Sequence, residues 1–185
     1  MKKYTIIGGV NGTGKSSFTG VMKSGVTDLG VIVDVDKITA SVGGKALEGE
    51  KIALQKINDC LDKGICFTQE STLSGSFVPR TARRAQDLGY YVRLYYIGLD
   101  TVDESLERIQ NRIRRGGHNI DPEDVKRRFA GRWEAVAAVL PYCDEAVFYD
   151  NDNGFAEVAA YRNGELLLIG EYRPAWILEL QAYLK

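Results

Sequence analysis

One eight-residue segment near the N-terminus restricts the possible folds of this chain more than any other feature. Residues 9–16 read Gly-Val-Asn-Gly-Thr-Gly-Lys-Ser and satisfy the pattern G-x-x-x-x-G-K-[ST] in full. A short β-rich run from Tyr4 to Ile7 precedes this segment, and a helical pattern from about Lys15 to Lys23 follows it. A strand, a glycine-rich turn and a helix in this order are typical of a phosphate-binding loop. The sequence therefore predicts a P-loop NTPase fold.

The residue types in this segment each suit a triphosphate. Glycines let the backbone curl so that its N–H groups point inward at a helix N-terminus, which creates an anion-binding nest. Lys15 is expected to reach the β- and γ-phosphates, and the hydroxyl of Ser16 to bind Mg²⁺. The predicted nucleotide-binding residues are Gly9, Asn11, Gly12, Thr13, Gly14, Lys15, Ser16 and Ser17. The expected cofactors are ATP (or GTP) and Mg²⁺.

Strand and helix patterns alternate along the rest of the chain. The strand-like runs are 31–35, 65–68, 91–97 and 146–149, and the helical patterns are 48–63, 78–88, 102–114, 122–139 and 174–183. This alternation predicts a parallel sheet with helices on both faces. Near the C-terminus, Asn163-Gly164 between two apolar runs is a strong signal for a β-hairpin.

These patterns predict one α/β domain over residues 1–185. A length of 185 residues with 44% hydrophobic content suits one domain with a full-sized core. We expect a P-loop NTPase three-layer sandwich around a central, mostly parallel five-stranded sheet. An arginine-rich helical lid at about 108–122 and a C-terminal β-hairpin plus helix at about 155–185 complete the expected architecture.

Composition disfavours several classes of protein. The formal net charge of -1 lacks the basic excess typical of a domain that holds nucleic acid through its phosphates. The three cysteines, at unrelated spacings, match no metal-binding pattern. The N-terminus lacks the features of a secretory signal, and no apolar run reaches the ~20 residues of a membrane span. A cytoplasmic location without membrane contact is expected.

Carboxylates lie at the ends of two predicted strands. Asp34 and Asp36 end one strand and Glu70 ends another, where ligands of a doubly wound sheet bind. A carboxylate facing the γ-phosphate can accept the proton of an attacking hydroxyl. Strand alternation would place Asp34 and Asp36 on the same side, so either could be this base. We favour Asp36, although it could instead cap a short helix starting at Lys37. Asp36, Glu70 and Thr72 are the predicted substrate-binding residues, with an ordinary solvated loop as the other interpretation of the segment after Glu70.

Arginines gather between the fourth and fifth predicted strands. Arg108, Arg112, Arg114 and Arg115 precede Gly116-Gly117-His118. Guanidinium groups suit the negative charge that spreads over the γ-oxygens during phosphoryl transfer. Small-molecule kinases often carry such arginines on a mobile helical lid at this place in the chain. The alternative is a solvated helix whose arginines pair with Glu104 and Glu107.

Taken together, the chain resembles the zeta-toxin-like family of P-loop kinases, and within it the small bacterial branch of predicted ATPases. The resemblance covers about residues 4–150. It rests, in order, on residues 9–16, Val33 to Ile38, Glu70 to Gly75, Arg112 to His118, Asp121 to Phe129 and Tyr149 to Asn151. The Glu-Ser-Thr-Leu-Ser-Gly and Arg-Gly-Gly-His segments are more specific than the phosphate loop, which many families share.

This resemblance implies an activity and a set of roles. Family members transfer a phosphoryl group from ATP or GTP to small molecules, and the toxins among them act on UDP-N-acetylglucosamine. By position, the resemblance implies Lys15, Asp36, Arg112 and Arg115 as catalytic residues, with Asp36 as general base and the two arginines as lid residues. It places Ser16 on Mg²⁺ and Glu70 near the acceptor. The implied partners are a small-molecule acceptor and an antitoxin protein.

Three functions remain open from the sequence. The first is an ATP-dependent kinase that phosphorylates a small-molecule hydroxyl, such as that of a UDP-N-acetyl sugar. The second is a nucleotide-binding module of a toxin-antitoxin or regulatory system, with ATPase but no kinase activity. The third, an enzyme acting on RNA or DNA ends, is disfavoured by the net charge. Phosphorylation of a metabolite discriminates the first from the second.

Overall fold

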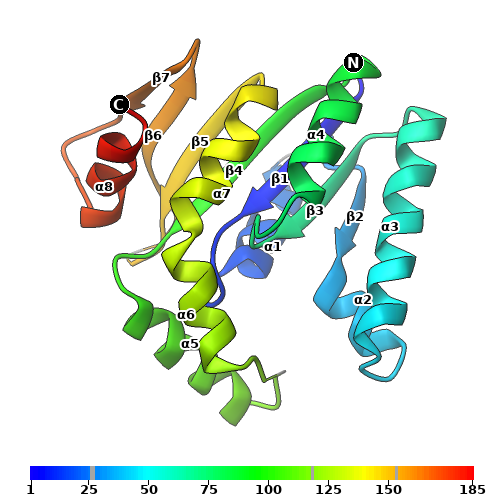
Figure 1. Ribbon diagram of the computed structural model, residues 1–185, viewed down its shortest axis with the longest axis horizontal. Helices are drawn as coiled ribbons and strands as arrows, with labels where there is room; N and C mark the ends of the chain where they lie inside the picture. The colour runs from blue at the N-terminus through cyan, green and yellow to red at the C-terminus, as the bar shows by residue number, and fades with distance from the viewer. Residues whose placement is uncertain (26–27, 118, 153) are drawn as a thin grey trace.

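The computed structural model describes residues 1–25, 28–117, 119–152 and 154–185. Within these residues the strands form one sheet of seven with the order β2-β3-β1-β4-β5-β6-β7 (Figure 1). The strands are β1 (Lys3–Gly8), β2 (Val31–Asp34), β3 (Phe67–Ser71), β4 (Tyr91–Gly98), β5 (Glu145–Asp150), β6 (Ala156–Arg162) and β7 (Glu165–Leu168). The helices are α1 (Lys15–Gly25), α2 (Val35–Ser41), α3 (Ala46–Lys63), α4 (Phe77–Asp87), α5 (Val102–Arg114), α6 (Pro122–Ala130), α7 (Arg132–Val139) and α8 (Ala175–Tyr183), with a 3₁₀ turn η1 (Leu140–Tyr142). Among the helices so described, none is long and apolar enough to cross a membrane.

The α/β fold is confirmed, but the expected number of strands is wrong. Strands β1 to β5 pair in parallel, as expected. The C-terminal hairpin does not stand apart from this sheet: β6 pairs antiparallel with β5, from Ala146 opposite Tyr161 to Asp150 opposite Ala156. Strand β7 then pairs antiparallel with β6. The hairpin extends the sheet to seven strands because the free edge of β5 offers a row of N–H and C=O groups that pairing satisfies.

Helices cover the two faces of the sheet unequally. Successive side chains of a strand point to opposite faces, and in β4 Leu94 packs on one face while Tyr95 packs on the other. The first face packs against α3, α4, α7 and α8. Phe18 of α1 covers the second face together with Tyr95 and Tyr149. Figure 1 accordingly shows α1 behind the sheet and α4 and α7 in front of it. The three layers therefore differ in size.

Two helix boundaries differ from the expectation. Strand β2 ends at Asp34, and α2 begins directly at Val35, so Asp34 and Asp36 do not alternate along one strand as predicted. The expected helix over 122–139 is interrupted at Gly131, which ends α6 and begins the turn into α7. Glycine is the poorest helix former after proline, so a change of helix direction costs least there.

The C-terminal helix α8 is part of the core. Trp176 is fully buried and stacks near Trp133 of α7, with ring centroids 6.3 Å apart. A Cβ added to Gly98, at the end of β4, would lie 2.2 Å from the Trp176 ring. Burial of an aromatic side chain of this kind contributes on the order of 2–3 kcal/mol. The segment after β5, whose role the sequence left open, therefore helps to fix the carboxyl ends of β4 and β5.

Candidate active site

The phosphate loop connects β1 to α1, and its glycines adopt conformations that other residues disfavour. Gly12 and Gly14 have φ values of 82° and 93°, in the left-handed region that glycine adopts without steric cost. A Cβ on Gly9 would lie 2.6 Å from the carbonyl oxygen of Ile97. The Thr13 hydroxyl donates to the Val10 carbonyl at 3.1 Å, which stabilises the turn of the loop. The predicted nucleotide-binding segment thus has the shape of a nest.

Lys15 folds back over this loop. Its Nζ donates to the carbonyl oxygens of Gly9 at 2.8 Å and Val10 at 3.0 Å. The side chain is half-buried, and its amine lies over the concave side of the backbone curl. A triphosphate bound in the nest would therefore meet this amine directly.

The charges around Lys15 define the centre of the candidate site. Desolvation lowers the pKa of Lys15 from 10.5 to about 8, and the positive charge of Arg112 acts in the same direction. The carboxylates of Glu70, Asp36 and Asp34 oppose the shift, in decreasing order. Such coupling requires that these groups lie within electrostatic reach of the amine. The structure thus brings Lys15, Asp36, Glu70 and Arg112 together.

Glu70 joins β3 to helix α1 through two hydrogen bonds. It is buried near the end of β3, and its Oε2 accepts a hydrogen bond from the Ser16 hydroxyl at 2.7 Å. Its Oε1 accepts one from Thr19, also at 2.7 Å. Mg²⁺ takes oxygen ligands and is usually held by one or two carboxylates, waters and substrate phosphates. The Ser16 hydroxyl and the Glu70 carboxylate beside it form a set of oxygen donors that fits this ion.

The structure distinguishes the two aspartates after β2. Asp34 is buried, accepts a hydrogen bond from the Lys37 backbone N–H at 3.1 Å and pairs with the Lys37 Nζ at 2.9 Å. It is the N-cap of α2, so the capping role considered for Asp36 belongs to Asp34. Asp36 lies in the first turn of α2 with an exposed side chain. Of the two aspartates, Asp36 is therefore the one whose side chain is exposed and takes no part in capping α2.

The loop after β3 turns sharply at Leu73. Thr72 is half-buried, and its hydroxyl donates to the Ser74 hydroxyl at 3.3 Å. Leu73 has a φ of 64°, a conformation that costs a non-glycine residue free energy unless its surroundings hold it. The buried Leu73 side chain and a 2.9 Å bond from its N–H to the Ser71 hydroxyl do so. This turn directs the following serines toward a neighbouring pocket.

That pocket is lined by arginines from two separate segments. It encloses about 580 Å³ between the loop after Thr72, helix α4 and helices α6 and α7. Arg80, Arg83, Arg127 and Arg128 line it, together with Glu134. Arg128 also donates to the Asn11 side-chain oxygen at 3.1 Å. The pocket therefore adjoins the phosphate loop. Sequence reasoning gave Arg80 and Arg83 no role, because their spacing on α4 does not reveal which residues α6 places opposite.

The predicted lid residues have different surroundings. The segment 108–122 includes the end of α5 and the first residue of α6. Arg108, Arg112 and Arg115 line a second pocket of about 500 Å³ with Gly117, and Arg108 also pairs with Asp152 at 3.1 Å. His118 lies outside the described residues. Arg112 and Arg115 therefore lie at one cavity, and the positive charge of Arg112 acts on Lys15 of the phosphate loop.

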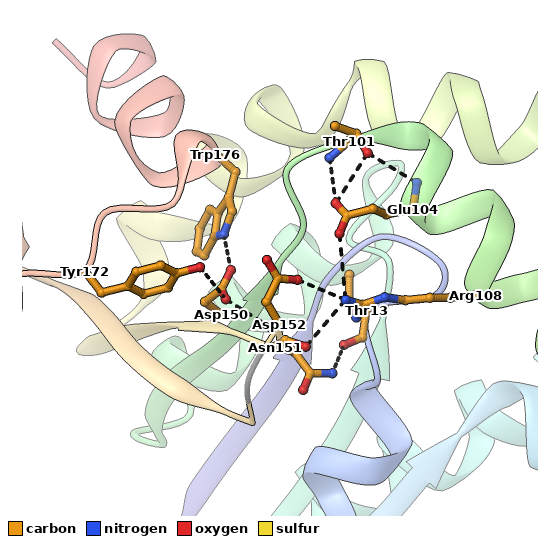
Figure 2. A network of polar contacts seen from close by, with 9 residues as sticks. All are labelled: Thr13, Thr101, Glu104, Arg108, Asp150, Asn151, Asp152, Tyr172 and Trp176. Atoms are coloured by element: carbon orange, nitrogen blue, oxygen red, sulfur yellow. Dashed lines mark hydrogen bonds and ion pairs between the residues drawn. The ribbon is translucent and has the colours of Figure 1, made fainter.

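A contact from the end of β5 to the phosphate loop had no predicted role. Figure 2 shows the Asn151 side chain donating to the backbone carbonyl of Thr13, at 2.9 Å. The Tyr149 to Asn151 segment was recognised as part of the resemblance, without a function for Asn151. The sequence signal is weak, because a single asparagine after a strand is common in loops.

The α/β sheet and the phosphate loop between β1 and α1 give this chain the fold of a P-loop protein. No family model matches the chain. The chain belongs to the same family as an uncharacterized protein of Haemophilus influenzae, with 31% identity over 126 residues that cover 65% of this chain and 88% of that protein.

Solved structures share the fold at low sequence identity. A structure of the PezAT chromosomal toxin-antitoxin system of Streptococcus pneumoniae matches with a TM-score of 0.67 and 17% identity, covering 100% of this chain and 86% of that one. The AvrRxo1-ORF1:AvrRxo1-ORF2 complex, solved with sulphate ions and also with ATP, matches with a TM-score of 0.70 and 15% identity. There the alignment covers 97% of this chain and 63% of that one. The resemblance to the zeta-toxin-like P-loop kinases is thereby confirmed at the level of the fold.

The lowered pKa of Lys15 makes nucleotide affinity depend on pH. Bound phosphates favour the protonated amine, so binding raises the pKa above its free value of about 8. Full affinity is therefore expected below pH 8, with a loss of up to about tenfold per pH unit as the pH rises above that value. Calorimetric titration of ATP between pH 7.5 and 9.5 measures this, with Lys15→Ala expected to flatten the profile. An unchanged wild-type affinity across pH 8 would contradict the lowered pKa.

Proposed function

We propose that this chain is an ATP-dependent kinase that transfers the γ-phosphoryl group to a hydroxyl of a small, phosphate-bearing molecule such as a UDP-N-acetyl sugar. The observation that carries the proposal is the arginine-lined pocket beside the phosphate loop. Arg128 lines this pocket and also contacts Asn11 of the loop. One side chain therefore borders both the acceptor position and the nucleotide position.

The chemistry of the pocket favours an anionic acceptor. Guanidinium groups bind phosphate oxygens in bidentate geometry, and four arginines line one cavity. A volume of about 580 Å³ lies within the ~300–1,000 Å³ range of small-molecule sites. Nucleotide binding at the loop is supported by the similarly folded AvrRxo1-ORF1:-ORF2 complex, which was solved with ATP.

We propose direct in-line transfer without a phosphoenzyme. Asp36 accepts the proton of the acceptor hydroxyl, and Lys15 neutralises charge on the β- and γ-phosphates. Ser16 and Glu70 would hold Mg²⁺, which would supply charge neutralisation at the same phosphates. Arg112 and Arg115 approach from the lid and stabilise the charge that develops on the transferred group. Closure of this segment would also exclude water, which limits hydrolysis of ATP.

A transfer assay tests the proposal. The purified chain is incubated with γ-labelled ATP and Mg²⁺, first with UDP-N-acetylglucosamine and then with a bacterial metabolite extract. We expect one labelled product that Lys15→Ala does not form. A product with UDP-N-acetylglucosamine would identify the acceptor, and a product from the extract alone would assign a different one. If the chain binds ATP but no labelled metabolite forms, the proposed kinase activity is refuted.

Arginines of the pocket should govern the affinity for the acceptor. Arg80→Ala and Arg83→Ala are each expected to raise the KM of the acceptor about tenfold, because each removes a charge-assisted hydrogen bond to a phosphate. The KM of ATP should stay within a factor of about two. Arg162→Ala, on the distant hairpin, makes the same charge change outside the pocket and is the control. Equal effects of all three variants would show that the net charge of the protein, and not the arginines of the pocket, determines the KM of the acceptor.

A second function is favoured by the C-terminal surface. Exposed apolar side chains occur on the hairpin, the following loop and α8: Leu167, Ile169, Tyr172, Leu178 and Tyr183. The similarly folded PezAT structure comes from a toxin-antitoxin system. The chain would then be a nucleotide-binding module that controls an antitoxin or another partner. Nucleotide-dependent partner binding without metabolite phosphorylation would establish this function in place of the kinase.

A further inference from the structure

Asn151 connects the carboxyl end of β5 to the phosphate loop. Its Nδ2 donates to the carbonyl oxygen of Thr13 at 2.9 Å (Figure 2). The same amide nitrogen would lie 2.6 Å from a Cβ built on Gly14. The Asn151 amide therefore packs directly against the Thr13–Gly14 peptide, in space that a side chain at residue 14 would need.

The contact fixes the direction of a single peptide group. In a planar trans peptide the C=O and the N–H point in opposite directions. A Thr13 carbonyl held toward Asn151 therefore turns the Gly14 N–H away from Asn151, toward the other side of the loop. Gly14 has a φ of 93°, and glycine can rotate its flanking peptides at low cost. Without an external hydrogen bond this peptide could adopt other orientations.

Asn151 is itself held by neighbours on both sides. The preceding Asp150 is buried and accepts hydrogen bonds from the Trp176 indole at 2.8 Å and the Tyr172 hydroxyl at 3.2 Å. Arg108 of α5 pairs with Asp152 and reaches the Asn151 carbonyl oxygen at 3.5 Å (Figure 2). The amide is thus held by contacts within the protein. This arrangement lowers the conformational cost of forming an anion-binding nest.

We propose that Asn151 is a positioning residue for phosphate binding. It orients the Thr13–Gly14 peptide so that the Gly14 N–H points into the nest, where it donates to a phosphate of the nucleotide. The inference rests on the proposed nucleotide binding and assigns a further residue to it. Asn151 acts through the backbone of the loop and does not itself touch the nucleotide.

Two variants of Asn151 distinguish the effect of losing the hydrogen bond from the effect of adding a charge. Asn151→Ala removes the donor without adding charge, whereas Asn151→Asp removes the donor and adds a negative charge. Asn58→Asp makes the same change in α3, where Asn58 accepts from Arg84, and is the matched control. Inorganic tripolyphosphate is the probe, because it reports on the nest without a nucleoside.

Both Asn151 variants are expected to weaken tripolyphosphate binding about tenfold, as expected for the loss of one oriented donor to a charged group. The control should bind as the wild type does. In ¹H–¹⁵N spectra of Gly14-labelled protein, tripolyphosphate should shift the Gly14 amide proton downfield in the wild type but not in Asn151→Ala. This signature reports the peptide orientation directly, and a general loss of stability would not mimic it.

Each outcome has a separate meaning. If Asn151→Ala binds as tightly as the wild type and keeps the Gly14 shift, the positioning role is overturned. A loss confined to Asn151→Asp that disappears at high salt would also overturn it, because charge repulsion alone would then explain the effect. If the wild type fails to bind tripolyphosphate or ATP, the proposed nucleotide binding fails instead. Thermal unfolding without ligand confirms that each variant is folded.

Discussion

Replacement of Asp36 by Asn is expected to abolish phosphoryl transfer while ATP affinity changes by no more than a few-fold. Asp36 is exposed in the first turn of α2, yet its charge acts on Lys15. We therefore propose that it lies beside the position of the γ-phosphate and receives the proton of an attacking hydroxyl. Loss of a general base costs about 10²–10⁴ in rate, whereas the phosphate loop and Lys15 remain intact for binding.

The neighbouring aspartate provides the control. Asp34→Asn removes the same charge two residues earlier but keeps a side-chain oxygen that can cap α2, because asparagine is as good an N-cap as aspartate. We expect this variant to retain most of the transfer rate. The two rates are compared in the same γ-phosphate assay, with ATP affinity measured by calorimetry. Turnover retained by Asp36→Asn but lost by Asp34→Asn would move the role of base to Asp34.

Lys15→Ala is expected to lower the transfer rate by at least about 10²–10³-fold, since one preorganised donor to a developing charge is worth that much. It should also weaken ATP binding, because the amine lies over the loop where the phosphates bind. The same substitution is expected to favour folding of the ligand-free protein. The pKa of Lys15 is lower in the folded protein than in the unfolded chain, so its charge opposes folding at neutral pH.

Thermal unfolding separates these two effects. Without nucleotide, Lys15→Ala should unfold at the same temperature as the wild type or above it. With saturating ATP, the wild type should gain stability and the variant should gain little. Lys23→Ala, exposed in the last turn of α1, is the matched control and should behave as the wild type in both measurements. A large fall in the unfolding temperature of ligand-free Lys15→Ala would contradict the desolvated lysine.

Local sequence patterns were sufficient to predict those parts of the fold whose conformation depends on residues adjacent in the chain. The phosphate loop was predictable because its glycines, lysine and serine must follow one another for the backbone to form a nest. The hairpin turn at Asn163-Gly164 was predictable for the same reason: Asn163 and Gly164 both have positive φ values, 53° and 85°. The alternation of strands and helices likewise indicated the parallel core of the sheet.

Contacts between distant segments were not predictable in this way. The sequence did not indicate that the hairpin joins the edge of β5 or that Asp34 rather than Asp36 caps α2. The bonds from Ser16 and Thr19 to Glu70 join residues more than 50 positions apart, and packing of α1 on the sheet decides them.

The sequence by itself therefore determined the class of fold, the position of the phosphate loop and the approximate place of its acidic and basic partners. The tertiary structure alone decided which carboxylate faces Ser16, which arginines share a pocket and which side chain orients the loop. The physical reason is that a nest forms from consecutive peptide groups, whereas a pocket forms when helices and strands pack. The arginines of α4 and α6 illustrate this, since they line one cavity although they are more than 40 residues apart.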